Sequence, residues 1–432
     1  MFHACRFTVW RAPHQAHALR AICLLLAWTL TTLAQTPAET LPDGYVGGPY
    51  KLLATDVTGD GRSELVVGYR SIGIVTVEQI DDRGQLQRIG LNALTVPVPL
   101  GARHVHNLED RDLNGDGLTD LALTLGGNGP AQPGRILLAT NRGQGRFQPV
   151  VEYTVPSEAK GIRLADLDND GRLDLLYTAR GSGYKGDIKV GRLYLRQGLG
   201  TQEFGPALVC DAGKSAYYVE TADLDGDGFL DIVIPNEHDS TVTYFMNSGS
   251  ALFQQRKLPR RAQVRATQIP GRRSHAVNDV RAADFNGDGH LDLITANLGT
   301  STLSLFLGKG DGTFHPDQLL EGGKNGAFLA VGDLDRDGDL DLVVTHWTED
   351  FLSVLLNQSD GKFVPRQDYQ TGSGNYGVAL LDFNQDGNLD AATANYRAES
   401  VSVLAGQGDG TFQPAVTTRR GLRSFNGKWH PH

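Results

Sequence analysis

The sequence predicts an all-β protein built as a seven-bladed β-propeller with four antiparallel strands in each blade. The main observation is a nine-residue acidic motif that occurs seven times, at intervals of 49 to 61 residues. Repeats of this period are typical of solenoids and propellers. The copies begin at Asp56, Asp112, Asp166, Asp223, Asp284, Asp333 and Asp382.

Each repeat has room for four strands. In the sixth repeat we expect them at 328–331, 340–345, 352–356 and 363–367, with the acidic motif between the first two. In five repeats an apolar residue lies 30 positions after the motif begins, which indicates one shared hairpin geometry. Closure into a ring protects most sheet edges. An open solenoid is the alternative, but it would need capping repeats that the sequence does not contain.

The motif places oxygen-bearing side chains at positions 1, 3, 5 and 9 and glycine at position 6. Ca²⁺ takes 6 to 8 oxygen ligands, and only a tightly curled loop turns so many inward. Glycine permits that curl, since it has no Cβ. Mg²⁺ fits less well, because it prefers a strict octahedron and retains its waters. We therefore expect calcium-binding hairpin loops holding up to seven Ca²⁺ ions.

The candidate calcium ligands, in chain order, are Asp56, Thr58, Asp60 and Glu64; Asp112, Asn114, Asp116 and Asp120; Asp166, Asp168, Asp170 and Asp174; Asp223, Asp225, Asp227 and Asp231; Asp284, Asn286, Asp288 and Asp292; Asp333, Asp335, Asp337 and Asp341; and Asp382, Asn384, Asp386 and Asp390. The first loop is degenerate. An EF-hand would need a glutamate at position 12 and flanking helices, but position 12 is apolar. The alternative is that these residues only form turns and bind no metal.

These motifs, with a downstream Gly-x-x-Phe, resemble the FG-GAP or VCBS repeat family, which includes the integrin α-subunit propeller and many secreted bacterial proteins. The resemblance covers nearly all of residues 50–418. It implies the propeller fold and calcium binding. Propellers of this family serve as adhesion modules, lectins and parts of polysaccharide lyases, so the resemblance implies less about function.

Residues 1–34 are interpreted as a signal peptide, because arginines precede an apolar run of about 14 residues that is too short to span a bilayer. A retained amphipathic anchor is the alternative. We assign 35–49 to a linker, 50–418 to the propeller and 419–432 to a C-terminal tail. The protein is expected to be secreted, either extracellular or periplasmic, with no membrane span. The mature chain would keep only Cys210, so metal rather than disulfide would staple it.

Charge also points to the loops. The chain has 40 basic and 50 acidic residues, and without the three signal arginines its net charge is −13. The loops hold 24 of the carboxylates, and seven Ca²⁺ ions would bring the net charge near +1. The acidity therefore belongs to the metal sites, and we expect no nucleic-acid partner. A basic run at 256–273 could bind an acidic partner or form a solvated loop.

The ligand site is predicted at the mouth of the central channel, opposite the acidic loops. Six residues before the loops stand polar and aromatic side chains, and further candidates follow the second strand. The candidates are Tyr50, His106, Lys160, Tyr217, Asn278, Tyr376, His346 and Trp347. Aromatic faces and directional polar groups suit sugars or peptide side chains. The alternative is that these residues only pack and shape turns.

We interpret the protein as a non-catalytic binding or adhesion module for a carbohydrate or an extracellular protein. Common hydrolase, metalloprotease and phosphate-loop motifs are absent from the sequence. The alternative is a carbohydrate-active enzyme, resembling a polysaccharide lyase, with a base such as His106 or Lys160 at the mouth.

One further expectation concerns the innermost strands. Three residues before consecutive loops stand Glu109, Arg163, Glu220 and Arg281. Neighbouring blades place equivalent residues side by side, so these charges should alternate around the channel as partly buried ion pairs. If they only face channel water, their coupling should be small.

Overall fold

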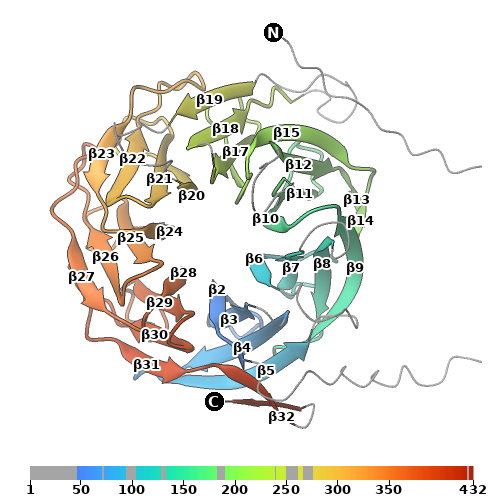
Figure 1. Ribbon diagram of the computed structural model, residues 1–432, viewed down its shortest axis with the longest axis vertical. Helices are drawn as coiled ribbons and strands as arrows, with labels where there is room; N and C mark the ends of the chain where they lie inside the picture. The colour runs from blue at the N-terminus through green and yellow to red at the C-terminus, as the bar shows by residue number, and fades with distance from the viewer. Residues whose placement is uncertain are drawn as a thin grey trace, which may run out of the picture.

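The computed structural model describes residues 46–70, 73–93, 104–127, 133–181, 190–238, 240–249, 261–265, 276–425 and 428–431. Seven four-stranded antiparallel sheets surround a central axis (Figure 1), which confirms the predicted propeller. In every sheet the strand order follows the chain from the innermost to the outermost strand. The predicted signal peptide and most of the basic run lie outside the described residues. Within the described residues, no helix is long and apolar enough to cross a membrane.

The blades are numbered here in chain order. Blade 1 contains β2 (Pro49–Thr55), β3 (Glu64–Tyr69), β4 (Ile74–Ile80) and β5 (Leu86–Ala93); blade 2 contains β6 (Val105–Arg111), β7 (Asp120–Leu125), β8 (Gly134–Asn141) and β9 (Phe147–Val155); and blade 3 contains β10 (Ala159–Ala165), β11 (Asp174–Ala179), β12 (Val190–Arg196) and β15 (Leu208–Lys214). Blade 4 contains β16 (Glu220–Ala222), β17 (Asp231–Asn236), β18 (Thr241–Phe245) and β19 (Arg261–Arg265).

Blade 5 contains β20 (Ala276–Ala283), β21 (Asp292–Leu298), β22 (Thr302–Phe306) and β23 (Gln318–Glu321); blade 6 contains β24 (Gly326–Gly332), β25 (Asp341–His346), β26 (Phe351–Leu355) and β27 (Gln367–Gln370); and blade 7 contains β28 (Asn375–Leu381), β29 (Asp390–Asn395), β30 (Ser400–Leu404) and β31 (Val416–Arg419). A short hairpin, β13 (Gly198–Gly200) and β14 (Glu203–Phe204), extends blade 3.

A separate three-stranded sheet joins the two ends of the described chain. β1 (Val46–Gly47) pairs with β32 (Leu422–Phe425), which pairs with β33 (Lys428–Pro431). These strands lie within the segments that the sequence analysis assigned to the linker and the tail.

The fourth strand of blade 6 begins later than the sequence predicted. Phe363, expected to start it, instead makes an isolated bridge with Asn357, and the strand runs over Gln367–Gln370. The Phe363 ring packs edge-on against Phe285 of blade 5, with centroids 6.1 Å apart. The aromatic residue after the turn therefore serves the core between blades, and the ladder resumes only beyond it.

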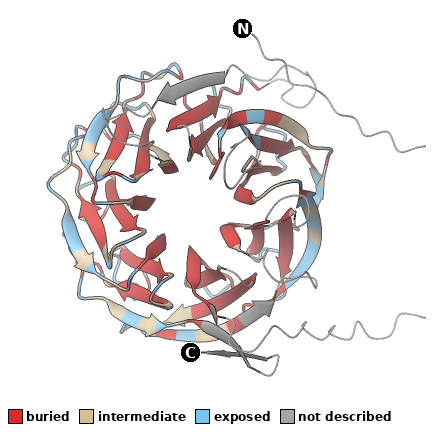
Figure 2. Cartoon of the chain, in the orientation of Figure 1, coloured by how far each residue is buried: buried red, intermediate tan, exposed pale blue. Residues whose placement is uncertain are grey.

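The core consists of the spaces between adjacent blades. Each of seven apolar clusters combines buried residues from two neighbouring blades, and an eighth cluster lies at the axis. The second strands are buried along their whole length in blades 1 to 4, 6 and 7, whereas the outermost strands are partly exposed (Figure 2). Burial of each Val, Leu or Ile side chain contributes about 1.5–3 kcal/mol. No blade could bury its two faces alone.

The predicted charges on the innermost strands form a continuous network. Arg163 lies 2.9 Å from Glu109 and 2.7 Å from Glu220, and Arg281 lies 3.1 Å from Glu220 and 3.1 Å from Asp279. Burial alone would raise the pKa of Glu220, but Arg163 and Arg281 outweigh it and hold that pKa below its usual value. The expectation of alternating ion pairs is confirmed.

We predict that Arg163→Met destabilises the protein by about 3–5 kcal/mol, because it leaves two carboxylates buried without their partner. A double-mutant cycle of Arg163→Met with Glu220→Gln, followed by denaturant unfolding, should give a coupling free energy above about 1 kcal/mol. The control cycle uses the exposed Arg192 and Asp211 pair, 3.8 Å apart, where about 0–1 kcal/mol is expected. Equal coupling in the two cycles would contradict the prediction.

Candidate functional site

The seven acidic loops share one backbone conformation. In every loop the glycine at position 6 has a φ between 83° and 93°, and its N–H donates to the position 1 carboxylate. A Cβ at Gly117 or Gly228 would meet nothing within 4 Å. The backbone angle, rather than lack of space, therefore requires glycine here.

Position 4 of every loop is also left-handed, a feature that the sequence analysis missed. The residues are Gly59, Gly115, Asn169, Gly226, Gly287, Arg336 and Gln385, with φ between 55° and 79°. Arg336 and Gln385 rarely adopt this conformation. The residue types at these positions therefore did not predict the left-handed conformation, because the loop as a whole imposes the φ angle.

Positions 5 and 9 hold the loop closed. The position 5 aspartate accepts a hydrogen bond from the N–H of position 7 in all seven loops. The position 9 carboxylate is buried and accepts the N–H of position 2, as Asp174 does from Leu167 at 2.9 Å. Burial raises the pKa of Asp174 to about 7 and that of Asp341 to about 6. The loops therefore concentrate carboxylates whose ionised form the fold alone does not favour.

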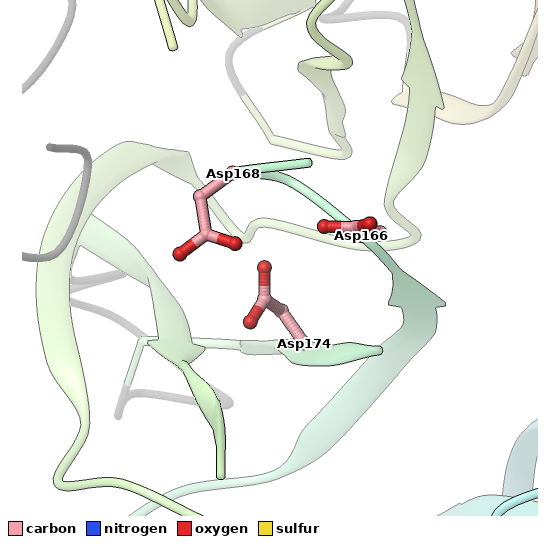
Figure 3. Close-up of side chains that lie close together, drawn as sticks. All are labelled: Asp166, Asp168 and Asp174. Atoms are coloured by element: carbon pink, nitrogen blue, oxygen red, sulfur yellow. The ribbon is translucent and has the colours of Figure 1, made fainter. Parts of the chain in front are cut away.

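Three loops gather three carboxylates closely enough to hold a metal ion. These are Asp166, Asp168 and Asp174; Asp223, Asp225 and Asp231; and Asp333, Asp335 and Asp341, and in each set the ligand oxygens lie within 4.8 Å of one another. Figure 3 shows the carboxylates of the first set pointing toward one another. One buried oxygen of Asp168 and one of Asp333 have no hydrogen-bond partner. The donor set is all oxygen, which fits a hard divalent cation such as Ca²⁺.

The loops with asparagine at position 3 differ. The amides of Asn114, Asn286 and Asn384 each donate to the position 5 carboxylate at 2.9 Å. In the first loop the Thr58 hydroxyl donates to Glu64 at 3.1 Å. In these four loops a side chain of the loop itself therefore donates to a carboxylate. In the loops of blades 3, 4 and 6 position 3 is an aspartate, which can only accept, although one oxygen of Asp170 is paired with Arg172. The loops with aspartate at position 3 thus rank above the other four as candidate metal sites.

The residues six positions before the loops meet at the centre of the propeller. The predicted side chains Tyr50, His106, Lys160, Tyr217, Asn278 and Tyr376 are each only 2–5% exposed. Tyr50 and Tyr376 stack with their ring centroids 3.8 Å apart, and the hydroxyls of Tyr217 and Tyr376 lie 2.7 Å apart. Burial raises the pKa of Tyr50 to about 12. With Tyr218 and Phe328 these rings form one apolar cluster, which we call the central plug.

His106 and Lys160 belong to a charged network beside the plug. The Glu158 carboxylate lies 3.0 Å from His106 Nε2, 2.9 Å from Lys160 Nζ and 3.5 Å from Arg180 Nη1. Burial alone would raise the pKa of Glu158, but Lys160 and His106 outweigh it and hold that pKa well below its usual range. Burial lowers the pKa of His106 to about 4, so its imidazole is neutral at pH 7.

Arg180 extends this network to blade 4. Its guanidinium lies 3.1 Å from Glu237, and Glu237 also accepts a hydrogen bond from the Ser215 hydroxyl at 2.9 Å. Lys160 and Arg180 are thus each matched by a carboxylate. We call Glu158, Lys160, His106, Arg180 and Glu237 the paired half of the mouth.

The accessible layer of the mouth lies just outside the plug, fourteen residues after each loop begins. These positions are Arg70, Gly126, Arg180, Glu237, Leu298, Trp347 and Tyr396. All except Gly126 are partly exposed. Of these residues, only Trp347 was among the ligand candidates of the sequence analysis. The repeat register could have identified the others, because each follows the last residue of a second strand or comes at its end.

Arg70, Trp347, Tyr396 and Arg397 form the aromatic half of the mouth, contributed by blades 1, 6 and 7. Trp347 and Tyr396 lie nearly parallel, at 7°, with centroids 6.1 Å apart. The Arg70 guanidinium lies 5.5 Å from the centre of Trp347 and 5.0 Å from that of Tyr396. Arg397 lies 5.6 Å from the centre of Trp347. Cations over aromatic faces are attracted by the ring quadrupole.

His346, a predicted ligand contact, is fully buried in blade 6. Its Nδ1 lies 3.0 Å from the Lys324 carbonyl oxygen, and its Nε2 lies 2.8 Å from the Ser353 hydroxyl. Asn395 has the same position in blade 7 and bonds to strand hydroxyls in the same way. His346 therefore stabilises blade 6 from within, while the following residue, Trp347, belongs to the accessible layer of the mouth.

A cleft of about 740 Å³ lies away from the mouth, beside the first acidic loop. Its lining includes Arg88, Arg420 and Phe383. Both arginines are paired with the buried Glu78, at 2.8 and 3.0 Å. Arg88 and Arg420 are thus already neutralised, and the cleft has no pair of parallel aromatic rings, so we place the candidate ligand site at the mouth.

The fold and the loops define a class, the β-propellers with acidic hairpin loops. Residues 112–177 and 284–344 match the family model described as FG-GAP-like repeat. Two stretches of the chain, in blades 2 and 3 and in blades 5 and 6, therefore match FG-GAP-like repeats, in line with the resemblance seen in the sequence. No curated protein sequence matches the chain.

Several solved structures share the fold. A lectin from Agrocybe aegerita, described as recognising non-reducing terminal N-acetylglucosamine, is 19% identical, with a TM-score of 0.52 over 85% of this chain and 93% of the lectin. The periplasmic gluconolactonase of Pseudomonas aeruginosa is 14% identical, with a TM-score of 0.57 over 89% and 99%. A putative 6-phosphogluconolactonase of Bacteroides uniformis is 11% identical, with a TM-score of 0.56 over 87% and 96%. At these identities the similarity shows the fold alone.

We predict that acid destabilises the paired half of the mouth. The His106 pKa is about 4 in the folded protein and about 6.5 when unfolded, so between these pH values the unfolded chain binds more protons and stability falls as pH falls. The loss from this group should reach about 2 kcal/mol at pH 5. In thermal melts, His106→Asn should lose less stability between pH 7.5 and 5 than the unmodified protein. The exposed His315→Asn serves as control, and identical pH profiles for all three would contradict the prediction.

Proposed function

We propose that this protein is an exported, calcium-stapled propeller that binds a carbohydrate at the mouth and performs no chemistry. The observation that carries the proposal is the aromatic half of the mouth, where Trp347 and Tyr396 lie parallel and partly exposed beside two arginines. Flat apolar rings with nearby hydrogen-bond donors suit the alternating apolar and polar faces of a sugar. Export rests on the signal-like residues 1–34.

Calcium is the ion that the loops support best. Aspartate oxygens from positions 1, 3 and 9 converge in the loops of blades 3, 4 and 6, and the partnerless oxygens of Asp168 and Asp333 suit a cation. The loop peptide could add a carbonyl ligand, as in other calcium loops. A bound ion would neutralise carboxylates that otherwise repel one another at the hairpin between the first two strands. It would therefore act as a staple of the blade.

A binding role fits the mouth better than catalysis does. A lyase base has to reach the proton that it removes. His106 and Lys160 are each 3% exposed and both contact Glu158. The Agrocybe aegerita lectin shows that a protein of similar fold recognises a sugar, whereas the lactonases show that the fold alone does not decide between binding and catalysis.

We predict that a calcium chelator lowers the melting temperature of the mature protein by about 10 °C or more, because an ion bound only by the native state adds to the free energy of unfolding. Asp337→Ala, in a loop with aspartate at positions 1, 3, 5 and 9, should remove more of this calcium-dependent stability than Asp60→Ala in the degenerate first loop. Calorimetric melts with calcium and with chelator provide the comparison. An unchanged melting temperature in chelator would contradict calcium stapling, and equal effects of the two variants would contradict the ranking of the loops.

We predict that a glycan array and titration calorimetry will detect sugar binding that depends on Trp347. Trp347→Ala should weaken binding about 10- to 30-fold, since a central aromatic side chain typically contributes about 1.5–2 kcal/mol. Leu199→Ala removes an equally apolar but remote exposed side chain, and it should leave affinity unchanged. Absence of any bound glycan would refute the carbohydrate proposal. Product formation from uronate polymers, followed by absorbance, would instead support the lyase alternative.

A further inference from the structure

We propose that the sugar bound by the aromatic half of the mouth is acidic, with Arg70 and Arg397 binding its carboxylate or sulfate group while Trp347 and Tyr396 contact its ring. This inference rests on the proposed carbohydrate-binding function and specifies the class of ligand. Three features of the mouth carry it: the pairing of its arginines, the way in which Arg70 is held, and the distribution of acidic side chains.

Arg70 differs from Arg163, Arg180 and Arg281 in having no carboxylate partner within the described residues. Its guanidinium contacts the rings of Tyr50, Trp347 and Tyr396, at 5.0–5.5 Å. Arg163 and Arg180, by contrast, each lie within 3.5 Å of two carboxylates. A partly buried cation is stable when an anion neutralises it. The mouth therefore contains a preformed cationic position whose counter-ion is available to come from outside.

The aromatic rings hold Arg70 in a form suited to an oxyanion. A guanidinium that stacks on aromatic rings keeps its N–H groups in its own plane, where they can bind a carboxylate with two parallel hydrogen bonds. Within the described part of the chain, the Arg70 side chain donates none of these hydrogen bonds to protein. The Arg397 guanidinium lies over the same Trp347 ring and is exposed. Two cationic groups thus flank one aromatic surface.

The glutamate that follows Trp347 is engaged elsewhere. Glu349, which follows Trp347 by two residues, accepts a hydrogen bond from Thr348 at 2.8 Å and lies 3.7 Å from Lys324. The 24 loop carboxylates lie at the other ends of the first strands, beyond the plug. In the paired half, Glu158 and Glu237 already neutralise Lys160 and Arg180. The positive charge of the aromatic half is thus the one that a ligand would meet.

A sugar is favoured over an acidic peptide by the rings beside the cations. Trp347 and Tyr396 lie nearly parallel with their centroids 6.1 Å apart, and both rings are partly exposed, so they offer apolar faces to the apolar side of a sugar ring. An acidic peptide would use the arginines but would need little from these faces. The experiment should therefore test whether the two rings and the two arginines all contribute to the affinity for one ligand.

The test uses calcium-saturated full-length mature protein and matched trisaccharides: glucose, galactose and mannose trimers, their uronate counterparts, and a sulfated galactose trimer. Titration calorimetry at 50 and 300 mM salt measures each affinity, with hexaglutamate as the peptide probe. At least one acidic trimer should bind 10-fold or more tightly than its neutral counterpart, and its affinity should fall with salt. The carboxylated and sulfated probes identify which oxyanion is preferred.

Variants then assign the roles. Arg70→Gln should weaken the acidic trimer at least 10-fold and leave the neutral one within 2-fold, whereas Arg70→Lys, which keeps the charge but not the two parallel hydrogen bonds, should be intermediate. Trp347→Ala should weaken both. Arg192→Gln, at an exposed side chain of β12 in blade 3, controls for net charge and should change neither. Melting temperatures establish that each variant is folded, and Arg70→Lys remains informative where Arg70→Gln is unstable.

The outcomes separate this inference from the function on which it rests. If no trimer binds, the carbohydrate proposal fails. If neutral and acidic trimers bind equally, or if folded Arg70→Gln and Arg70→Lys keep the full preference for the acidic one, sugar binding stands and the acidic specificity is wrong. If hexaglutamate binds as tightly as the best uronate and Trp347→Ala leaves that affinity unchanged, the site is one for acidic peptides and the inference is overturned.

Discussion

Each blade depends on one buried carboxylate at position 9 of its acidic loop. In blades 2 to 7, one oxygen of this group accepts the N–H of position 2, and the other accepts an N–H at or just beyond the end of the third strand, as Asp341 does from Leu334 and Asn357. A single side chain therefore joins the loop to three strands. Because the carboxylate is excluded from water, these hydrogen bonds cannot be exchanged for solvent without cost. The motif consequently recurs at a fixed place even where the outer positions of the loop change.

The repeat pattern made most of the fold predictable. Seven motifs in one register determined the number of blades, and the same register placed Glu109, Arg163, Glu220 and Arg281 side by side in the ring. The start of the fourth strand was less predictable. A phenylalanine such as Phe363 is equally suited to a β-strand and to the apolar core between two blades, so its residue type does not tell which place it takes. The left-handed backbone conformation of Arg336 and Gln385 was equally unpredictable from residue type, since the closed loop imposes their φ angle against the usual preference of these residues.

The ligand site was the hardest part to predict from the sequence, for a steric reason. The register correctly brought Tyr50, Tyr217 and Tyr376 to the axis, but it carries no information about the width of the channel. The structure shows large rings meeting across that width and burying one another. The next layer outward, which includes Arg70 and Tyr396, then becomes the accessible surface. The paired charges come from three different blades, 2, 3 and 4, and no local motif encodes their pairing.

The central plug gives both halves of the mouth a common floor. Trp347 rests on Tyr376 with centroids 5.1 Å apart, Tyr376 shares a hydrogen bond with Tyr217, and Lys160 lies 4.7 Å from the centre of the Tyr217 ring. Blades 4 and 7, on opposite sides of the axis, are thus connected by a hydrogen bond between two tyrosine hydroxyl groups. These contacts across the axis oppose distortion of the ring. The spacing of Arg70, Trp347 and Tyr396 therefore depends on the packing of the whole propeller, and not only on the three blades that carry these residues.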